Sequence, residues 1–572
     1  MGTEGTSSAN QRPAGAGVEL TRREVMTVLG GLLVALFLAA IDSTIVSTAL
    51  PTMAGELGGL DKLPWVLSAY LLTSTASTPL WGKFSDLWGR RLVFQVAIAW
   101  YLLASAVTGS APSMLVLVLG RALQGVGGGG IMALTFVIVG DLVSPRERGR
   151  YMGWFTGTFT SASVVGPLVG GFFVDHLSWR WIFFAKIPFG LVALLVVSRV
   201  LRLPSVRVRR RIDVEGAGLL ITAVSSLILV MIWGGDQFSW TSPTIVGLSL
   251  LCLVAVVGFV VQERRAQEPI IPLRLFRNRV VALALISSLA GGGAMMAAGS
   301  FLPLFLQVVG EVSATSSGLT MAPMMIMLTV GSVFAGNMMA RLGRYKIFLV
   351  LGPTLLVIGL IGLTRVNQDT TWETLLPWMA LLGIGMGFFM PITTTVTQNA
   401  LPIADLGAGT ATLTFARNLG QTIGVGAYGA ALASRMDSVL ERRLPAGSNV
   451  DIDELLSTPA RIRALPPDLN AIVLDAVTQA TRLVYTIAVP VGAVLLVAGL
   501  LIPEIPLRSW SAHAAKSGGS PNGTGTGTGT PAAAAAAGGT VSPGPAGNGS
   551  AAGHGAAAPA AGAGIPSGHA DR

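Results

Sequence analysis

Fourteen stretches of mostly apolar residues run through this chain, from 26–50 at the start to 482–502 at the end. Each is close to the roughly 20 residues that an α-helix needs to cross a bilayer. Hydrophobic residues make up 52% of the 572 residues and charged residues only 12%, which is more apolar material than a soluble domain buries. The sequence therefore predicts an all-α membrane protein with fourteen spans.

Lysine and arginine gather in every second connection between these stretches. Arg22 and Arg23 precede the first stretch, and Arg146, Arg148 and Arg150 follow the fourth. The positive-inside rule places such connections in the cytoplasm, so we expect a multi-pass protein of the cell membrane with both termini cytoplasmic. The net charge of +10 then reflects topology, and no nucleic-acid partner is expected.

An acid and a base lie deep in two of the predicted spans. Asp42 and Arg121 are each about eight residues, or about 12 Å, from the outer ends of the first and fourth spans. A charge in hydrocarbon costs about 2.5–3.5 kcal/mol, so the two side chains are expected to face each other or a shared aqueous cavity. The pair either fixes helix packing or carries protons. Asp42 is the candidate proton carrier, because no other carboxylate lies deep in a predicted span.

Further polar and aromatic side chains are candidates for a substrate cavity. Arg417 lies near the middle of the thirteenth span, where it either lines the cavity or bonds nearby carbonyl groups. Lys186 lies near the outer face of the sixth span and is expected to extend its amine to that interface. The candidate cavity residues are Trp65, Tyr70, Gln124, Lys186, Phe415, Arg417 and Asn418.

Small residues form two stripes along the fifth predicted span. One stripe contains Gly153 and Gly157, and the other contains Gly166 and Gly170, both at steps of four. Small residues at this spacing let neighbouring helices approach closely, and Pro167 allows a bend. Packing alone and a moving gate are both compatible with this pattern.

A short repeat indicates that the chain has two related halves. GKFSDLWGRR over 82–91 and GNMMARLGRYK over 336–346 share a seven-residue step between glycines, with a basic residue following. Repeated halves are typical of transporters. In the first copy Asp86 precedes the N-terminus of the third predicted span, where the helix dipole favours an anion, and Arg90 and Arg91 can pair with it or with lipid phosphate. The second copy has Ala340 instead, and the first loop is either a basic anchor or a conformational hinge.

Four motifs together resemble those of the fourteen-helix drug:proton antiporters of the major facilitator superfamily, namely IDSTIVSTALP, GKFSDLWGRR, RALQGVGGGG and GPLVGG. The resemblance covers residues 25–502 and implies alternating access around a central cavity, with proton coupling by Asp42 and Arg121. It places a conformational switch at Gly82, Asp86, Gly89, Arg90 and Arg91, and an antiporter motif at Gly157, Gly166, Pro167, Gly170 and Gly171. Relatives often carry Asn where this chain has Lys186, which leaves anionic or lipid-like substrates open.

The same resemblance implies two six-helix bundles with two additional central transmembrane helices. The expected parts are a disordered cytoplasmic N-terminus (1–25), the first bundle (26–201), a linker with the two extra helices (202–279), the second bundle with a long external loop at 435–481 (280–502), and a disordered cytoplasmic tail (503–572).

These observations predict a proton-coupled antiporter that exports amphipathic small molecules such as drugs and antibiotics. A dedicated exporter of an endogenous metabolite, antibiotic or lipid is an alternative, and a transport-inactive sensor or scaffold is another. An enzyme is not expected, because the sequence shows no nucleophile with a base, no metal cluster and no phosphate loop. The expected partners are the substrate, protons and the bilayer, with no cofactor and no metal, and the chain is expected to be a monomer.

Overall fold

The computed structural model describes residues 22–58, 62–201, 213–235, 237–310, 320–402, 405–443 and 466–507. Within those ranges all long elements are helices, and an isolated bridge between Gly234 and Phe238 is the only β pairing. The expected disorder of both termini falls largely outside these ranges. One difference is visible at the start, where residues 22–25 are already helical.

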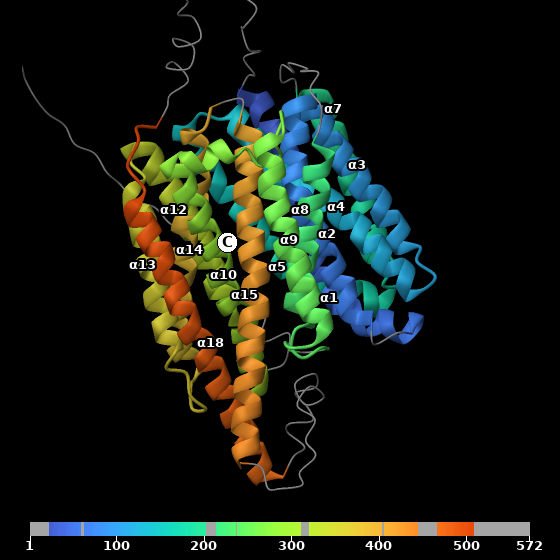
Figure 1. The fold of residues 1–572 in the computed structure, drawn as a ribbon, viewed down its shortest axis with the longest axis vertical. Coiled ribbons are helices and arrows are strands. Elements are labelled where there is room, and N and C mark those ends of the chain that lie inside the picture. The colour runs from blue at the N-terminus through green and yellow to red at the C-terminus, as the bar shows by residue number, and fades with distance from the viewer. Residues whose placement is uncertain are drawn as a thin grey trace, which may run out of the picture. The chain divides into compact units, whose positions relative to one another are not determined.

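Seven helices make up the first half of the described chain, and all but the short α6 are labelled in Figure 1. They are α1 (Arg22–Leu57), α2 (Leu63–Trp88), α3 (Arg90–Gly109), α4 (Met114–Leu142), α5 (Pro145–His176), α6 (Trp181–Phe184) and α7 (Lys186–Val200). The short α6 and α7 together form one span, Trp181–Val200. The first half therefore has six long helical elements, five of which are apolar enough to cross a membrane.

Two further helices and a second set of six complete the described chain. The linker contains α8 (Val214–Trp233), α9 (Pro243–Arg265) and the short η2 (Leu273–Arg277). The second half contains α10 (Arg279–Val308), α12 (Ala322–Leu342), α13 (Lys346–Leu363), α14 (Trp372–Ala400), α15 (Leu406–Arg443) and α18 (Pro467–Leu501). Helix α8 packs on α9, α2 and α15, so the extra pair contacts both halves through α8.

Twelve helices of the described chain are long and apolar enough to cross a membrane. Helices α2 and α15 are also long, with 26 and 38 residues, but their sequences are more polar. Both helices pack against each other, which removes those polar groups from lipid. The fourteen expected spans are compatible with these fourteen elements.

The long external loop expected at 435–481 is shorter in the structure. Helix α15 continues to Arg443 and α18 already begins at Pro467, so only 444–465 separates them, and that segment lies outside the described residues. The boundaries in the sequence prediction followed hydropathy, whereas these two helix ends are polar and extend beyond any apolar core.

The repeated motif has the same place in both halves. Gly82 of α2 packs against the backbone of α15, and Gly336 of α12 packs against the backbone of α5. Seven residues later, Gly89 and Gly343 each turn the chain with positive φ angles of 91° and 69°, a conformation that favours glycine. The two copies therefore occupy corresponding places in the two halves, but they are not identical, because ψ is 145° at Gly89 and 9° at Gly343.

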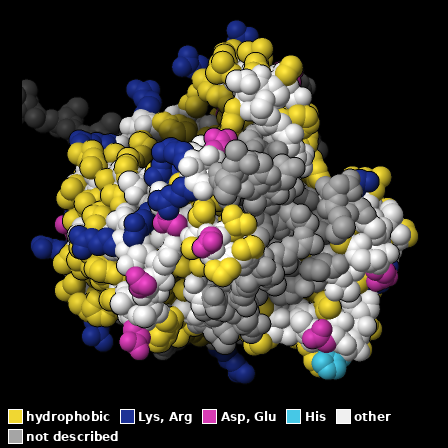
Figure 2. All heavy atoms as spheres, turned by 90° about the horizontal axis from the view of Figure 1, so that it is seen from below, with side chains coloured by type: hydrophobic (Ala, Val, Ile, Leu, Met, Phe, Trp, Pro, Cys, Tyr) yellow, Lys and Arg dark blue, Asp and Glu magenta, His cyan; other side chains and the backbone are white. Residues whose placement is uncertain are grey.

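Contacts between the halves concentrate at one end of the helices. Asp86 of α2 accepts a hydrogen bond from the Ala408 N–H at the start of α15. Gly149 near the start of α5 lies against Gly336 near the end of α12. We call this the Asp86 end, defined by these four residues. The opposite end, seen in Figure 2, carries interspersed acidic and basic side chains.

Candidate functional site

Asp42 lies at the centre of a fully buried charge cluster in the first half. Its carboxylate forms ion pairs with the Arg121 guanidinium of α4 and the Lys186 amine of α7. Asp42 and Arg121 are both 0% exposed and Lys186 is 3% exposed. Two neutral donors also reach Asp42 Oδ1, the Tyr101 hydroxyl at 3.3 Å and the Gln124 amide at 3.2 Å. One carboxylate thus holds two cations together away from water.

The surrounding residues fix the orientation of Arg121. Its Nε donates to the Val66 carbonyl at 3.0 Å, and its Nη1 also donates to Gln124 Oε1 at 2.7 Å. Its guanidinium lies 4.4 Å from the centre of the Tyr70 ring. These contacts restrict the side chain to one arrangement, and of the guanidinium nitrogens only Nη2 is buried without a hydrogen-bond partner. The predicted pairing of Asp42 with Arg121 is present, and Tyr70 and Gln124 from the candidate cavity set belong to it.

The expected position of Lys186 was wrong. Ala185, between α6 and α7, keeps helical backbone angles (φ −60°, ψ −22°), so the chain passes through Lys186 as one continuous span. From there its amine points inward to Asp42 and lies 5.0 Å from the Phe183 ring centre. If the Lys186 amine extended to the interface instead, Asp42 would be paired with Arg121 alone. The sequence signal that could have indicated this pairing is a lysine within a predicted span at a depth similar to that of a buried acid.

The remaining candidate cavity residues do not join this cluster. Trp65 meets Trp233 of α8 edge to face, with ring centres 5.5 Å apart. Phe415 packs with apolar side chains of α2 and α8. Arg417 donates to Thr394 Oγ1 of α14 at 3.2 Å, and the backbone carbonyl of its neighbour Asn418 accepts from Thr422. The second half therefore has a separate polar position.

The glycine stripes of α5 serve two different contacts. Gly166 and Gly170 lie against Thr44 and Thr48 of α1, close to Asp42. Gly157, with Thr329 as its nearest neighbour, faces α12 in the other half. Of the remaining motif residues, Pro167 lies inside the helix and Gly171 has open space beside it. Helix α5 thus links the Asp42 helix to the second half.

The switch motif forms an ionic network at the Asp86 end. Arg90 pairs with Asp86 and donates from Nε to Asp141 Oδ2 at 2.8 Å. The second carboxylate oxygen of Asp86 accepts from the Ala408 N–H at 2.8 Å, in the first turn of α15, where backbone donors lack partners within the helix. Asp86, four residues before the start of α3, thus also caps the N-terminus of α15, a contact that the sequence did not indicate. The sequence analysis did not identify Asp141, at the end of α4, as a member of this network.

The other switch residues hold the helices in place. Arg91 donates to the Ser198 carbonyl of α7 instead of pairing with Asp86. Gly82 lets α2 approach α15 so closely that an added Cβ would lie 2.9 Å from the Gly407 carbonyl oxygen. The switch motif therefore joins the two halves through backbone contact as well as through charge.

The linker after α9 is tied to both halves beside this network. Lys83 of α2 pairs with Glu268 at 2.6 Å, and Arg274 of η2 pairs with Asp405 at 2.5 Å. The hydrogen bond to Asp405 raises the pKa of the Arg274 guanidinium.

At the end of the helices opposite the Asp86 end, hydrogen bonds from Arg180 and Trp179 lower the pKa of the Glu56 carboxyl group.

Removing the Asp86 charge is expected to open the Asp86 end. In Asp86→Asn, Arg90 keeps Asp141 but loses the Asp86 carboxylate, and the α15 N-terminus loses an anion. A charged hydrogen bond contributes about 1.5–3 kcal/mol. Electron spin resonance distances between labels on the ends of α2 and α15 should lengthen in a large share of molecules. Glu56→Gln, at the opposite end, is the matched control. An unchanged distance distribution in Asp86→Asn would refute the role of this network.

Comparisons with known proteins give consistent results. The family model "Major Facilitator Superfamily" matches residues 32–425. The multidrug transporter protein MdtP of Bacillus subtilis is 35% identical over 446 residues, which cover 78% of this chain and 81% of the relative. Multidrug resistance protein 3 of Bacillus subtilis is 32% identical over 471 residues, covering 81% of this chain and 92% of the relative.

Solved structures share the fold. The human organic anion transporter MFSD10 matches with a TM-score of 0.55 and 15% sequence identity, covering 82% of this chain and 99% of the other. At that identity the likeness shows the fold alone.

Proposed function

The chain belongs to the major facilitator superfamily, and we propose that it is a proton-coupled antiporter that exports amphipathic small molecules across the cytoplasmic membrane by alternating access. The family and the fold are those of transporters and not of enzymes. The observation that carries the coupling proposal is the buried Asp42 carboxylate between Arg121 and Lys186. The names of the two Bacillus relatives support export.

Protonation of Asp42 is the step that links the proton to helix movement. With Asp42 ionised, the carboxylate screens Arg121 from Lys186 and holds α1, α4 and α7 together. With Asp42 neutral, the two cations face each other in a buried site, where repulsion is strong. Separation of the helices or entry of water then becomes favourable. One proton moving down 100 mV supplies about 2.3 kcal/mol.

We assign the Asp86 end to the cytoplasm, because Arg90, Arg91, Arg341 and Arg344 lie there. The halves are packed together at that end, so the described conformation corresponds to a state closed to the cytoplasm. In alternating access the opposite state must separate Asp86 from Ala408 and Gly149 from Gly336. Gly149 and Gly336 have no side chains to interlock, so the two helices can separate and meet again repeatedly at this contact.

Transport in proteoliposomes tests the proposal. With an imposed pH gradient and pyranine inside, we expect ethidium or decanesulfonate, added as probes, to cause substrate-dependent proton movement. Glu56→Gln, a carboxylate outside the cluster, should behave as the wild type. If the substrate moves at the same rate with and without the pH gradient, the protein is a transporter that is not coupled to protons. If no probe moves, a sensor or scaffold role is favoured.

A further inference from the structure

We propose that Arg417, Thr394 and Gln421, together with a methionine-lined pocket beyond them, bind the acidic head and apolar chain of an amphipathic anion. The inference rests on the proposed export function and narrows its substrate class. The ligand is an organic acid with a chain of roughly 12 Å, and not an anionic membrane lipid.

Arg417 is a deep cation without an acidic partner in the described chain. It lies about three turns into α15, which begins at Leu406. Arg417 is partly exposed, and its side chain donates a hydrogen bond to the neutral Thr394 hydroxyl at 3.2 Å. The two deep cations of the first half, by contrast, share Asp42. A guanidinium at membrane depth is costly unless an anion or water reaches it, so an external carboxylate or sulfonate suits this position.

Close helix packing fixes the backbone that carries Arg417. Gly292 of α10 lies directly against the Arg417 backbone carbonyl, and a Cβ added to Gly292 would also lie 3.0 Å from the Gln421 backbone nitrogen. On the same helix, Gly420 lies against the backbone of Leu289. This anchored backbone limits the positions that the guanidinium can take, which favours binding by reducing the entropy that is lost.

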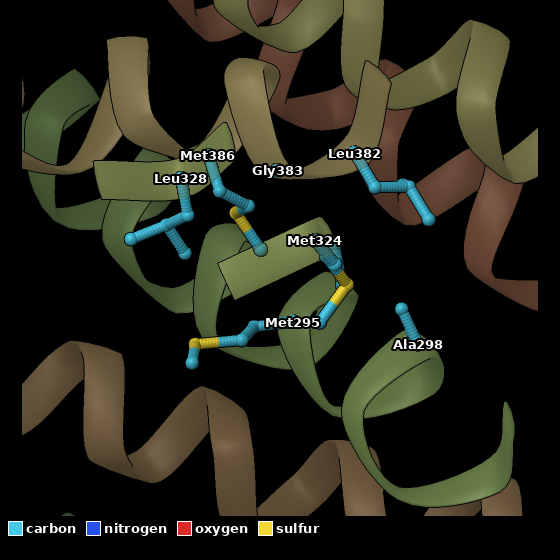
Figure 3. Close-up of a pocket in the computed structure, with 8 residues that line it drawn as sticks. Met295, Ala298, Met324, Leu328, Leu382, Gly383 and Met386 are labelled. Atoms are coloured by element: carbon cyan, nitrogen blue, oxygen red, sulfur yellow. The ribbon is translucent and has the colours of Figure 1, made fainter. Parts of the chain in front are cut away.

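The apolar part of the site is a pocket between α10, α12 and α14 (Figure 3). Its lining includes Met295, Ala298, Met324, Leu328, Leu382 and Met386. The cavity volume is about 10 Å³, room for about one water molecule. Methionine side chains rearrange easily, and Figure 3 shows the three methionines reaching in from three different helices, so the pocket can widen around a chain.

Two helices connect the polar and apolar parts. On α14, Met386 and Thr394 are eight residues apart, which places them on one face about 12 Å from each other. On the α10 side, Met295 lines the pocket while the Gln421 amide contacts its sulfur at 3.8 Å. A ligand whose head reaches Arg417 can therefore lay its chain along α14 into the pocket.

Binding of three decyl compounds tests the head-group assignment. Equilibrium binding to the full-length protein in detergent would be measured with decanesulfonate, decanol and decyltrimethylammonium. We expect Arg417→Gln to weaken decanesulfonate binding about tenfold or more and to leave decanol unchanged. Arg435→Gln, whose arginine contacts Gln479, is the control from the same helix. Equal weakening of decanol, or no change for decanesulfonate, would overturn the proposal.

The chain pocket has its own test. In the wild type, affinity should rise from hexanesulfonate to decanesulfonate, and Met386→Phe should flatten that rise without affecting hexanesulfonate. A rise that persists in Met386→Phe contradicts the pocket assignment. Nanodiscs with and without phosphatidylglycerol identify the source of the anion, because strong competition by this lipid would indicate a lipid site instead. These binding assays need no proton gradient, so their results do not depend on whether transport is proton-coupled. If decanesulfonate does not bind as expected, the proton-coupling proposal can still be tested separately.

Discussion

Asp42→Asn is expected to abolish proton-driven export while substrate binding persists. Asparagine keeps the shape and can still accept a hydrogen bond from Arg121, but it cannot alternate between charged and neutral forms. Loss of a proton-transferring side chain reduces rates by about 10²–10⁴-fold. The measurement is substrate-dependent proton movement in proteoliposomes, alongside equilibrium binding of the same substrate.

The same substitution leaves Arg121 and Lys186 buried without an anion, so a folding defect has to be separated from a coupling defect. Removing one partner of a buried pair costs about 3–5 kcal/mol. The double variant Asp42→Asn with Lys186→Met removes one of the two stranded cations, so we expect it to recover thermal stability but not coupling. Coupling that survives in either folded variant would remove Asp42 from the proton path.

Local sequence rules were sufficient for the helices and for one charged pair. Hydropathy located the spans, and the basic connections predicted their alternation. Counting residues from the outer ends put Asp42 and Arg121 at equal depth, which is the pair that the structure contains. These inferences succeed because helix rise and burial costs act within a single helix or between helices of known direction.

Contacts between distant segments were beyond the same rules. The Asp86 carboxylate meets the start of α15, 322 positions away along the chain, and one sequence carries no signal for that approach. Lys186 was misplaced because the motif FFAKIPFG does not show which face of its span is turned toward Asp42, with which the lysine pairs. The polar ends of α15 and α18 were assigned to a loop because hydropathy follows lipid contact, not helix formation.

Gly336→Val is expected to prevent closure of the Asp86 end and thereby stop turnover. Gly336 and Gly149 approach backbone to backbone across the halves, and even a Cβ on Gly149 would lie 2.9 Å from Gly336 Cα. A valine at this contact cannot fit unless α5 and α12 separate. Overpacking costs about 1–3 kcal/mol, which shifts the ratio of closed to open molecules about 5- to 150-fold. Binding in the second half should persist, because the pocket between α10, α12 and α14 lies away from the substituted contact.

A disulfide across the same interface reports closure directly. Thr156 and Ser332 have hydroxyl oxygens 2.9 Å apart, so cysteines at both positions in a Cys252→Ser background should crosslink readily in the closed state. We expect Gly336→Val to suppress this crosslink, and the matched Gly299→Val, where a Cβ has open space, to leave it intact. Normal crosslinking and turnover in Gly336→Val would mean that the halves do not need this contact to close. The glycine repeat would then serve the turns at Gly89 and Gly343 alone, and the switch would have to depend on Asp86 and Arg90.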